Sequence, residues 1–390
     1  MKHGGAMAAS KPREIIALDL LRFVSAMLVV AFHFGTAFAL APSSTGAVIL
    51  QGLPIADSAR PWTWFGWIGV ELFFVISGFV IAMSAEGASR DAFLRRRALR
   101  LLPSAWICAT ATVLVLAIAA PSSRLISEWS RSILFWPSGS WIDPSYWTLG
   151  IEVTFYALIA SSLGRSGRAG IIERVTMLLG VLSTAFWLLV IIAGWAVTPL
   201  MQYRPVQLML LPHGCFFALG VLAWAMLNRG VTAGRMLMFA IFFATGLTEI
   251  AARTVERTHA LGITAGPLIP ILVFTAGLGV VLGSTRLQAL LAARIDARLA
   301  MTLGLMTYPL YLIHQEIGAA IVSVSMRQGI PFPIAIGIAL AAVLVSAWGV
   351  VRVAEPALRA RLAALIDGAV ISARRGPVRD THPSASPPAG

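Results

Sequence analysis

Three ionisable side chains lie within the apolar stretch DLLRFVSAMLVVAFHF at residues 19–34, namely Asp19, Arg22 and His33. A charged side chain costs roughly 2.5 kcal/mol or more at the centre of a bilayer, so such residues suggest a functional site. Arg22 and His33 are eleven residues apart, which on a helix puts them on one face about 16 Å apart along the axis. A desolvated neutral imidazole is well suited to take a proton from a hydroxyl. The stretch therefore predicts a polar stripe that carries a base into the membrane.

Two alternative interpretations of this stretch remain open. In the first, Arg22 snorkels to the interface and Asp19 caps the helix. In the second, the basic start, the apolar core at 23–32 and Ala37-Phe38-Ala39 form a cleavable signal peptide. Cleavage would remove Arg22 and His33, so a function for these two residues would decide between the interpretations.

The composition indicates a polytopic membrane protein. Of the 390 residues, 58% are hydrophobic and 12% are charged, whereas about 25% are charged in an average soluble domain. The net charge of +13 comes mainly from Arg in short segments between apolar runs. This pattern is typical of topology signals, so we expect no nucleic-acid partner. Cys108 and Cys215 both lie in apolar runs, so we expect packing roles and no disulfide or metal site.

Runs of about 20 apolar residues predict an all-α fold of about ten transmembrane helices. We expect them at 16–40, 65–84, 98–119, 147–162, 175–197, 206–227, 236–252, 263–283, 300–325 and 333–351. Lys and Arg are concentrated on the side of the N-terminus, which predicts that both termini are cytoplasmic. The helix at 147–162 is short and contains Glu152, so it is a candidate for a partial span that lines a cavity. We expect cytoplasmic tails at 1–13 and 366–390, the second of them disordered.

Few other polar side chains occur at membrane depth. They are Glu71, Ser77, Glu152, His213, Tyr308, Tyr311 and His314. Glu71 or Glu152 would supply a carboxylate that orients His33 as a base. A structural hydrogen bond between helices is the alternative role for each carboxylate. The spacing of Tyr308, Tyr311 and His314 places them on one helix face.

Arginines and tryptophans supply two further candidate sites. The segment FLRRRALRLLP places Arg95, Arg96, Arg97 and Arg100 just before the third helix. They suit either anionic lipid or a phosphate-rich soluble ligand. Tryptophans, Trp147 among them, are frequent in and after the two longest internal connections, 41–64 and 120–146. They suit the interfacial belt, with a sugar-stacking surface as the alternative.

At these residues the chain resembles the membrane-bound acyltransferase 3 family. The matching pieces are LDLLRFVSAMLVVAFHF, FFVISGFVI, FLRRRALRLLP, YWTLGIEVTFY and YPLYLIH. The resemblance implies a transmembrane acyltransferase domain over 14–365 in a bacterial inner membrane. It implies acyl-CoA, usually acetyl-CoA, as a co-substrate rather than a permanently bound cofactor. It also implies an acceptor hydroxyl on a surface glycan or lipid-linked saccharide, and an essential pair formed here by Arg22 and His33.

His33, Arg22 and Glu152 are the candidate catalytic residues. Arg22 and the arginines Arg95, Arg96, Arg97 and Arg100 are the candidates for binding acyl-CoA. The candidates for binding the acceptor are Glu71, Trp147, Tyr311 and His314. A transporter or flippase remains the alternative, because many helices with ionisable groups near mid-membrane are also typical of transporters.

Overall fold

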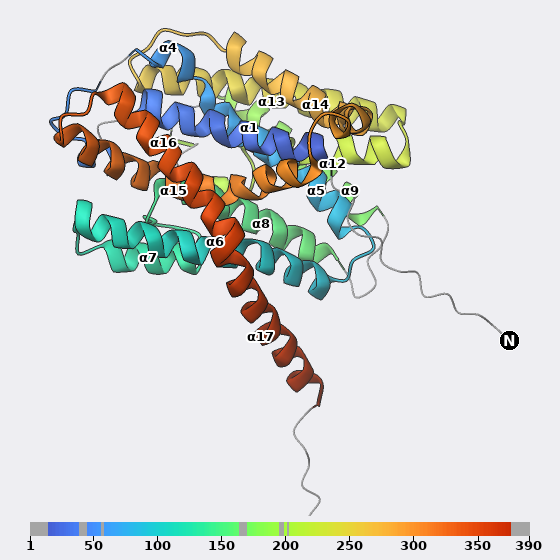
Figure 1. Ribbon diagram of the computed structural model, residues 1–390. Coiled ribbons are helices and arrows are strands. Elements are labelled where there is room, and N and C mark those ends of the chain that lie inside the picture. The colour runs from blue at the N-terminus through green and yellow to red at the C-terminus, as the bar shows by residue number, and fades with distance from the viewer. Residues whose placement is uncertain are drawn as a thin grey trace, which may run out of the picture.

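The computed structural model describes residues 15–38, 45–55, 58–163, 170–194, 199–200 and 203–375. Every regular element in these residues is helical, as the runs of apolar residues predict. Most of the long helices run side by side in one bundle, and the last helix, α17, projects from it (Figure 1). The elements are α1 (Ile16–Phe32), η1 (His33–Ala37), α3 (Thr45–Ile49), α4 (Arg60–Thr63), η2 (Gly66–Ile68), α5 (Gly69–Ala85), α6 (Arg90–Ala119), α7 (Leu125–Ile133), η3 (Pro144–Tyr146), α8 (Trp147–Ser162), α9 (Ile171–Ile192), α11 (Arg204–Leu208), α12 (Gly214–Arg229), α13 (Ala233–Ala260), α14 (Leu268–Ala292), α15 (Ala297–Arg327), α16 (Phe332–Gly349), η4 (Val350–Ala354) and α17 (Glu355–Arg375).

Seven helical segments in the described residues are long and apolar enough to cross a membrane. They are Ile16–Ala37, Arg60–Ala85, Arg90–Ala119, Ile171–Ile192, Ala233–Ala260, Leu268–Ala292 and Phe332–Gly368. The remaining three expected spans correspond to α8 and α12, of 16 residues each, and to α15. A helix of 16 residues is about 24 Å long, which is shorter than the hydrocarbon core of a bilayer. The chain is therefore a multi-pass membrane protein with short helices inside its bundle.

The first helix is part of the core of the bundle. α1 packs against α5, α14 and α15, and its residues Ala26, Val29 and Val30 are almost completely buried. Gly304 of α15 allows a close approach, because a Cβ atom there would lie 2.6 Å from Asp19 Oδ1. This packing favours α1 as a permanent helix over its interpretation as a cleaved signal peptide.

Glycines hold α5 closely against α12. A Cβ atom added to Gly220 would lie 1.9 Å from the Val75 carbonyl oxygen, and one added to Gly78 would lie 2.2 Å from that of Phe217. Small residues at helix contacts are the usual means of close packing in membranes. The contact fixes the position of α5, which forms one wall of the cavity described below.

Two predicted helices begin at other residues than expected. The run 206–227 is not one helix, because α11 ends at Leu208 and α12 begins only at Gly214. Between them Leu210 has a φ of 60°, and Pro212 offers no backbone N–H to continue the first helix. The third predicted helix starts earlier, at Arg90, where the Ser89 hydroxyl accepts a hydrogen bond from the Ala92 N–H over 3.3 Å. The arginine cluster therefore lies inside α6 and not before it.

Two helices extend further than predicted. α13 continues to Ala260 although its apolar run ends near 252, because its last turns bury a polar face in the bundle. α17 runs to Arg375, so residues 366–375 are helical and not part of a disordered tail. Its sequence is rich in Ala, Leu and Arg, which favour helix. Residues 1–13 and 376–390, also expected as tails, lie outside the described residues.

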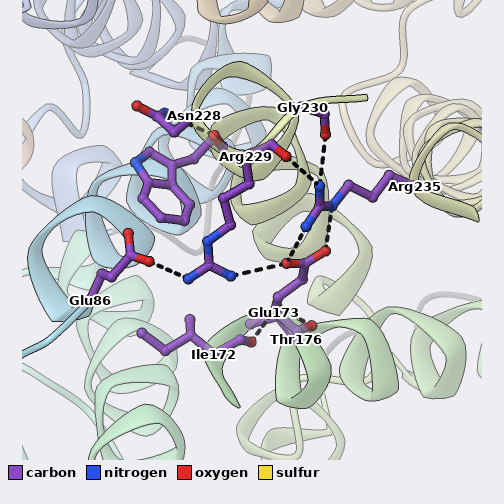
Figure 2. A network of polar contacts seen from close by, with 9 residues as sticks. Glu86, Ile172, Glu173, Thr176, Asn228, Arg229, Gly230 and Arg235 are labelled. Carbon is purple, nitrogen blue, oxygen red and sulfur yellow. Dashed lines mark hydrogen bonds and ion pairs between the residues drawn. The ribbon is translucent and has the colours of Figure 1, made fainter. Parts of the chain in front are cut away.

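An ionic network joins four helix termini at the end of the bundle where α1 begins. Figure 2 shows Arg229, the last residue of α12, between Glu86 after α5 and Glu173 in the first turn of α9. Arg235 in the first turn of α13 donates to both oxygens of Glu173, over 2.6 and 3.0 Å, and to the Gly230 carbonyl over 2.7 Å. The network fixes the starts of α9 and α13 to the ends of α5 and α12.

Candidate active site

A cavity of about 290 Å³ lies between α1, α5, α6, α8 and α15. Three guanidinium groups, those of Arg22, Arg97 and Arg100, contribute to its wall. The other lining residues are Val70, Phe73, Phe74, Ser77, Val80, Leu101, Thr148, Leu149, Glu152, Tyr156, Thr307, Tyr308 and Tyr311. We call this space the arginine-lined cavity. It joins an aromatic wall to a concentration of positive charge, as a site for an anionic ligand with an apolar arm requires.

The structure divides the arginine cluster of α6 between this cavity and the surface. Arg97 donates to the Ser84 hydroxyl over 2.7 Å and stacks on the rings of Phe93 and Tyr156 at 5.5 and 5.6 Å. Arg100 lies three residues further, on the same helix face. The guanidinium of Arg22 lies 3.5 Å from Asp19, as the spacing in α1 predicts.

The other two arginines of the cluster have contacts elsewhere. Arg95 makes two hydrogen bonds to Asp367 of α17, over 2.8 and 2.7 Å, on the surface. Arg96 donates to the Ser84 carbonyl over 2.8 Å. Neither lines the arginine-lined cavity, because successive residues of a helix point about 100° apart.

Glu152 lies in the cavity wall and not beside His33. Its Oε1 accepts hydrogen bonds from the Ser77 hydroxyl, over 3.0 Å, and from the Tyr156 hydroxyl. Its charge faces the same space as the arginines. The expectation that Glu152 orients His33 is therefore wrong in its geometry, although Glu152 does line a cavity from the short helix α8.

His33 contacts a second histidine. Its Nδ1 lies 3.0 Å from Nε2 of His314 on α15 and 3.0 Å from the Val29 carbonyl oxygen. His314 is completely buried, and its Nδ1 lies 2.8 Å from the Tyr311 carbonyl oxygen. His314 was expected to contact substrate, but it lies behind Tyr311 as the partner of His33. The two rings come from helices far apart in the chain.

The hydrogen bonds define the tautomers of two neutral rings. A carbonyl oxygen can only accept, so Nδ1 of His314 carries a proton and its Nε2 is an acceptor. Nδ1 of His33 must then donate, to His314 and to the Val29 carbonyl. The lone pair of His33 is therefore on Nε2, which is the atom able to remove a proton from a hydroxyl.

Tyr311 lies between the arginine-lined cavity and the two histidines. Its ring lines the cavity and is 5.8 Å from that of His314, centre to centre. Its hydroxyl accepts a hydrogen bond from the Thr148 hydroxyl over 3.1 Å, and its ring meets that of Phe73 edge-on at 5.9 Å. Tyr311 therefore connects the lining of the cavity to the pair of histidines.

Trp147 and Glu71 lie outside the lining of the cavity. The Trp147 carbonyl accepts a hydrogen bond from Arg204 over 3.0 Å, and the Trp147 ring is 6.0 Å from that of His213. Arg204 also stacks on Trp141 at 4.8 Å, and its burial lowers its pKa to about 10. Glu71 is buried 3.8 Å from Arg253. Since neither Trp147 nor Glu71 lines the cavity, the structure does not support the expectation that they contact an acceptor there.

A polar face of α13 is absent from the residues singled out in the sequence. Glu249, Arg253 and Arg257 follow one another at four-residue spacing, so they share one helix face. This face points into the bundle, where Glu249 contacts His213 over 2.8 Å. The spacing is a signal that the sequence contains, but the expected helix ended at 252, before the two arginines.

A buried carboxyl group connects the start of α8 to α15. Asp143 precedes η3, outside the candidate spans, and is completely buried. One of its oxygens accepts from the Ser145 N–H over 2.8 Å and the other from the Glu316 N–H over 3.2 Å. Burial disfavours the charged form and raises the pKa of Asp143 to about 6.

The comparisons with known proteins agree with this geometry. A family model described as an acyltransferase domain of the acyltransferase 3 type matches residues 15–352. Over 110 residues the chain is 36% identical to the exopolysaccharide production protein ExoZ of Rhizobium meliloti (strain 1021). That alignment covers 25% of the present chain and 34% of the relative, about a third of its length. No solved structure matches the chain.

Proposed function

Because the chain belongs to the acyltransferase 3 family, we propose that it transfers an acetyl group from acetyl-CoA to a hydroxyl of a cell-surface saccharide. The observation that carries the proposal is a cavity lined by three guanidinium groups and by Tyr311, whose ring lies 5.8 Å from that of His314, the partner of His33. A multi-pass membrane acyltransferase needs both ends of this arrangement. One end binds an anionic donor and the other activates a hydroxyl.

Acetyl-CoA is the proposed donor because its shape and charge fit the cavity. CoA has an anionic nucleotide end and a long thin arm that ends in the thioester. A volume of about 290 Å³ is small for a ligand site, so it suits the arm, with the phosphates at the arginines Arg97 and Arg100. The arm then passes Arg22 and the rings of Phe73 and Phe74 toward Tyr311.

The proposed orientation follows from the distribution of basic residues. Lys and Arg are concentrated on the side of the N-terminus, so we place both termini in the cytoplasm and the protein in the bacterial inner membrane. We assign ten membrane passages, with α8, α12 and α15 completing the seven long apolar segments. The arginines of α6 then face the compartment that supplies acetyl-CoA.

Transfer proceeds through His33 as the general base. Its Nε2 takes the proton of the acceptor hydroxyl, and the oxygen attacks the thioester carbonyl. A C–O bond forms, the C–S bond breaks, and the proton passes from His33 to the CoA thiolate. Before this step the side chain of Tyr311 must turn aside, because it separates the cavity from His33 and His314. An acyl-histidine intermediate is the rival mechanism. A labelled acyl group bound to the protein in the absence of acceptor would favour it.

The acceptor class rests on the relative. The printed name of ExoZ refers to exopolysaccharide production, so we propose an exopolysaccharide, or its lipid-linked repeat unit, as the acceptor. A hydroxyl of such a saccharide would reach His33 from the outer side of the membrane, because His33 lies at the end of α1 away from the cytoplasm.

The decisive experiment compares surface polysaccharide and lipid-linked saccharides from cells with and without this protein by mass spectrometry. We expect a mass increase of one acetyl group per modified unit only in cells with the protein. Cells that make His33→Ala at a matched protein level should lack this increase. Saccharides with identical masses in all three strains would refute the proposal. A saccharide that reaches the cell surface unacylated, and only when the protein is present, would instead favour a transporter.

A further inference from the structure

The polar face of α13 holds one arginine that differs from its neighbours. Arg253 lies near the carboxylate of Glu71, at 3.8 Å, and Glu249 contacts His213 over 2.8 Å. Among the ion pairs in the described part of the chain, none includes Arg257.

Aromatic rings hold Arg257 in place instead of a carboxylate. Its guanidinium carbon lies 5.0 Å from the centre of the Trp67 ring and 5.6 Å from that of Phe32. The rings fix the guanidinium plane and partly remove water from it. They do not satisfy its N–H groups, and the Arg257 Nε is buried without a hydrogen-bond partner. A buried donor in this state costs free energy, which an oxygen ligand would recover.

The position of this arginine connects it to the proposed reaction. Phe32 directly precedes His33, and the centres of the two rings are 5.2 Å apart. The Phe32 ring is thus a neighbour of both the Arg257 guanidinium and the His33 ring. The guanidinium therefore lies next to the residue that precedes the proposed base.

We propose that Arg257 binds the carbonyl oxygen of the acyl donor and stabilises the negative charge that this oxygen gains during transfer. The proposal rests on the proposed function. When the acceptor oxygen bonds to the carbonyl carbon, the π electrons move to the carbonyl oxygen, which Arg257 contacts. When the C–S bond breaks, they return to re-form the double bond, and the thiolate takes the proton held by His33. Arg257 itself gives up no proton.

Two groups with separate tasks explain why both a neutral histidine and a permanent cation are present. A cation that contacts the charge developed in the transition state lowers the barrier most in a site from which water is excluded. An arginine paired with a carboxylate would be less available for this contact, as Arg253 is beside Glu71.

The test uses the full-length protein in lipid nanodiscs. The probes are [acetyl-¹⁴C]acetyl-CoA and polysaccharide extracted from cells that lack the protein. Affinity is measured separately with a thioether analogue of acetyl-CoA that cannot be cleaved. The variants are Arg257→Gln, Arg257→Met, which keeps an unbranched apolar stem between the rings, and Arg257→Lys. The matched control is Arg229→Gln, which removes an arginine from the network in Figure 2, at the start of α13, whereas Arg257 lies in the last turn of that helix.

We expect Arg257→Gln and Arg257→Met to lower kcat about 100-fold or more, with affinity for the analogue within about threefold of wild type. Arg257→Lys should fall less, because it keeps the charge. The control should unfold at a lower temperature with an unchanged kcat per folded molecule. Size exclusion and thermal unfolding show whether each variant folds. If the neutral variants do not fold, the test uses Arg257→Lys, for which we expect a lower kcat with an unchanged affinity for the analogue.

Two results would overturn the assignment of Arg257 while leaving the proposed function intact. One is a normal kcat in the folded variants. The other is a loss confined to donor affinity or to the KM for polysaccharide, which would make Arg257 a binding residue only. A wild-type protein that forms no acetyl ester with these probes would overturn the proposed function and this assignment together.

Discussion

Replacement of His314 by phenylalanine should slow acyl transfer about tenfold without abolishing it. Phenylalanine has a similar shape but offers no acceptor to Nδ1 of His33, which now donates over 3.0 Å. One intramolecular hydrogen bond contributes roughly 0.5–1.5 kcal/mol net, which corresponds to about a 2- to 13-fold change in rate. The His33 tautomer survives, because the Val29 carbonyl remains 3.0 Å from the same nitrogen. The loss should therefore stay far below the roughly 10⁴-fold that follows a wrong tautomer in a catalytic triad.

The assay is transfer of labelled acetyl from acetyl-CoA in membranes that contain equal amounts of each variant. His33→Ala should lose at least about 100-fold, as expected for removal of a general base. His314→Gln is the matched variant, because its amide oxygen can accept the same proton, and it should retain more activity than His314→Phe. If His314→Phe were as inactive as His33→Ala, His314 would act on the proton directly. A wild-type rate in His314→Phe would show that the contact between the two rings does not position the base.

Three further predictions concern the cavity and the segment that leads into α8. Arg22→Lys keeps a charge but loses the planar fork, so transfer should fall at least about tenfold, and normal donor affinity and turnover would contradict its role. Arg97→Gln should raise the KM for acetyl-CoA about 10- to 100-fold, because a hydrogen bond to a charged group contributes roughly 1.5–3 kcal/mol. Arg95→Gln, at the surface, should change this KM less than about twofold. Equal effects of the two substitutions would refute the division of the arginine cluster between cavity and surface. The pKa of the Asp143 carboxyl is about 6 in the folded protein, against an ordinary value of 3.8. Between these two pH values the folded protein binds this proton and the unfolded chain does not. The free energy of unfolding should therefore fall by up to about 3 kcal/mol as the pH rises from about 4 to about 6. Asp143→Asn should lack this fall in thermal unfolding, and an unchanged pH dependence would exclude Asp143 as its cause.

The parts of the site that lie on one helix could be predicted from the sequence. Arg22 of α1 and Glu152 of the short helix α8 both line a cavity. In both cases the prediction needs only the period of a helix and the cost of polar groups in lipid. No knowledge of neighbouring helices was required.

The partner of His33 could not be found in this way. We expected a carboxylate from Glu71 or Glu152, because a base oriented by a carboxylate is the familiar arrangement. The structure instead brings His314 to His33 from the other end of the chain. Which of several buried polar residues meet depends on how the helices pack, and that information is spread over many apolar contacts. Arg257 was missed for a simpler reason, because a helix in a bundle continues beyond its apolar run when its polar face is buried.

The contact between the Thr148 and Tyr311 hydroxyls also bears on the electrical insulation of the membrane. In the proposed orientation the arginine-lined cavity faces the cytoplasm, and this contact lies in its wall, with Tyr311 next to His314. Each elementary charge that crosses a membrane gains about 2.3 kcal/mol per 100 mV, so an open connection would let protons leak and dissipate the potential. In the proposed function, Tyr311 turns aside for a two-carbon group and then returns, so that the acetyl group crosses while neither CoA nor the saccharide does. We propose that the saccharide is modified in this way from a cytoplasmic donor without an open channel through the protein.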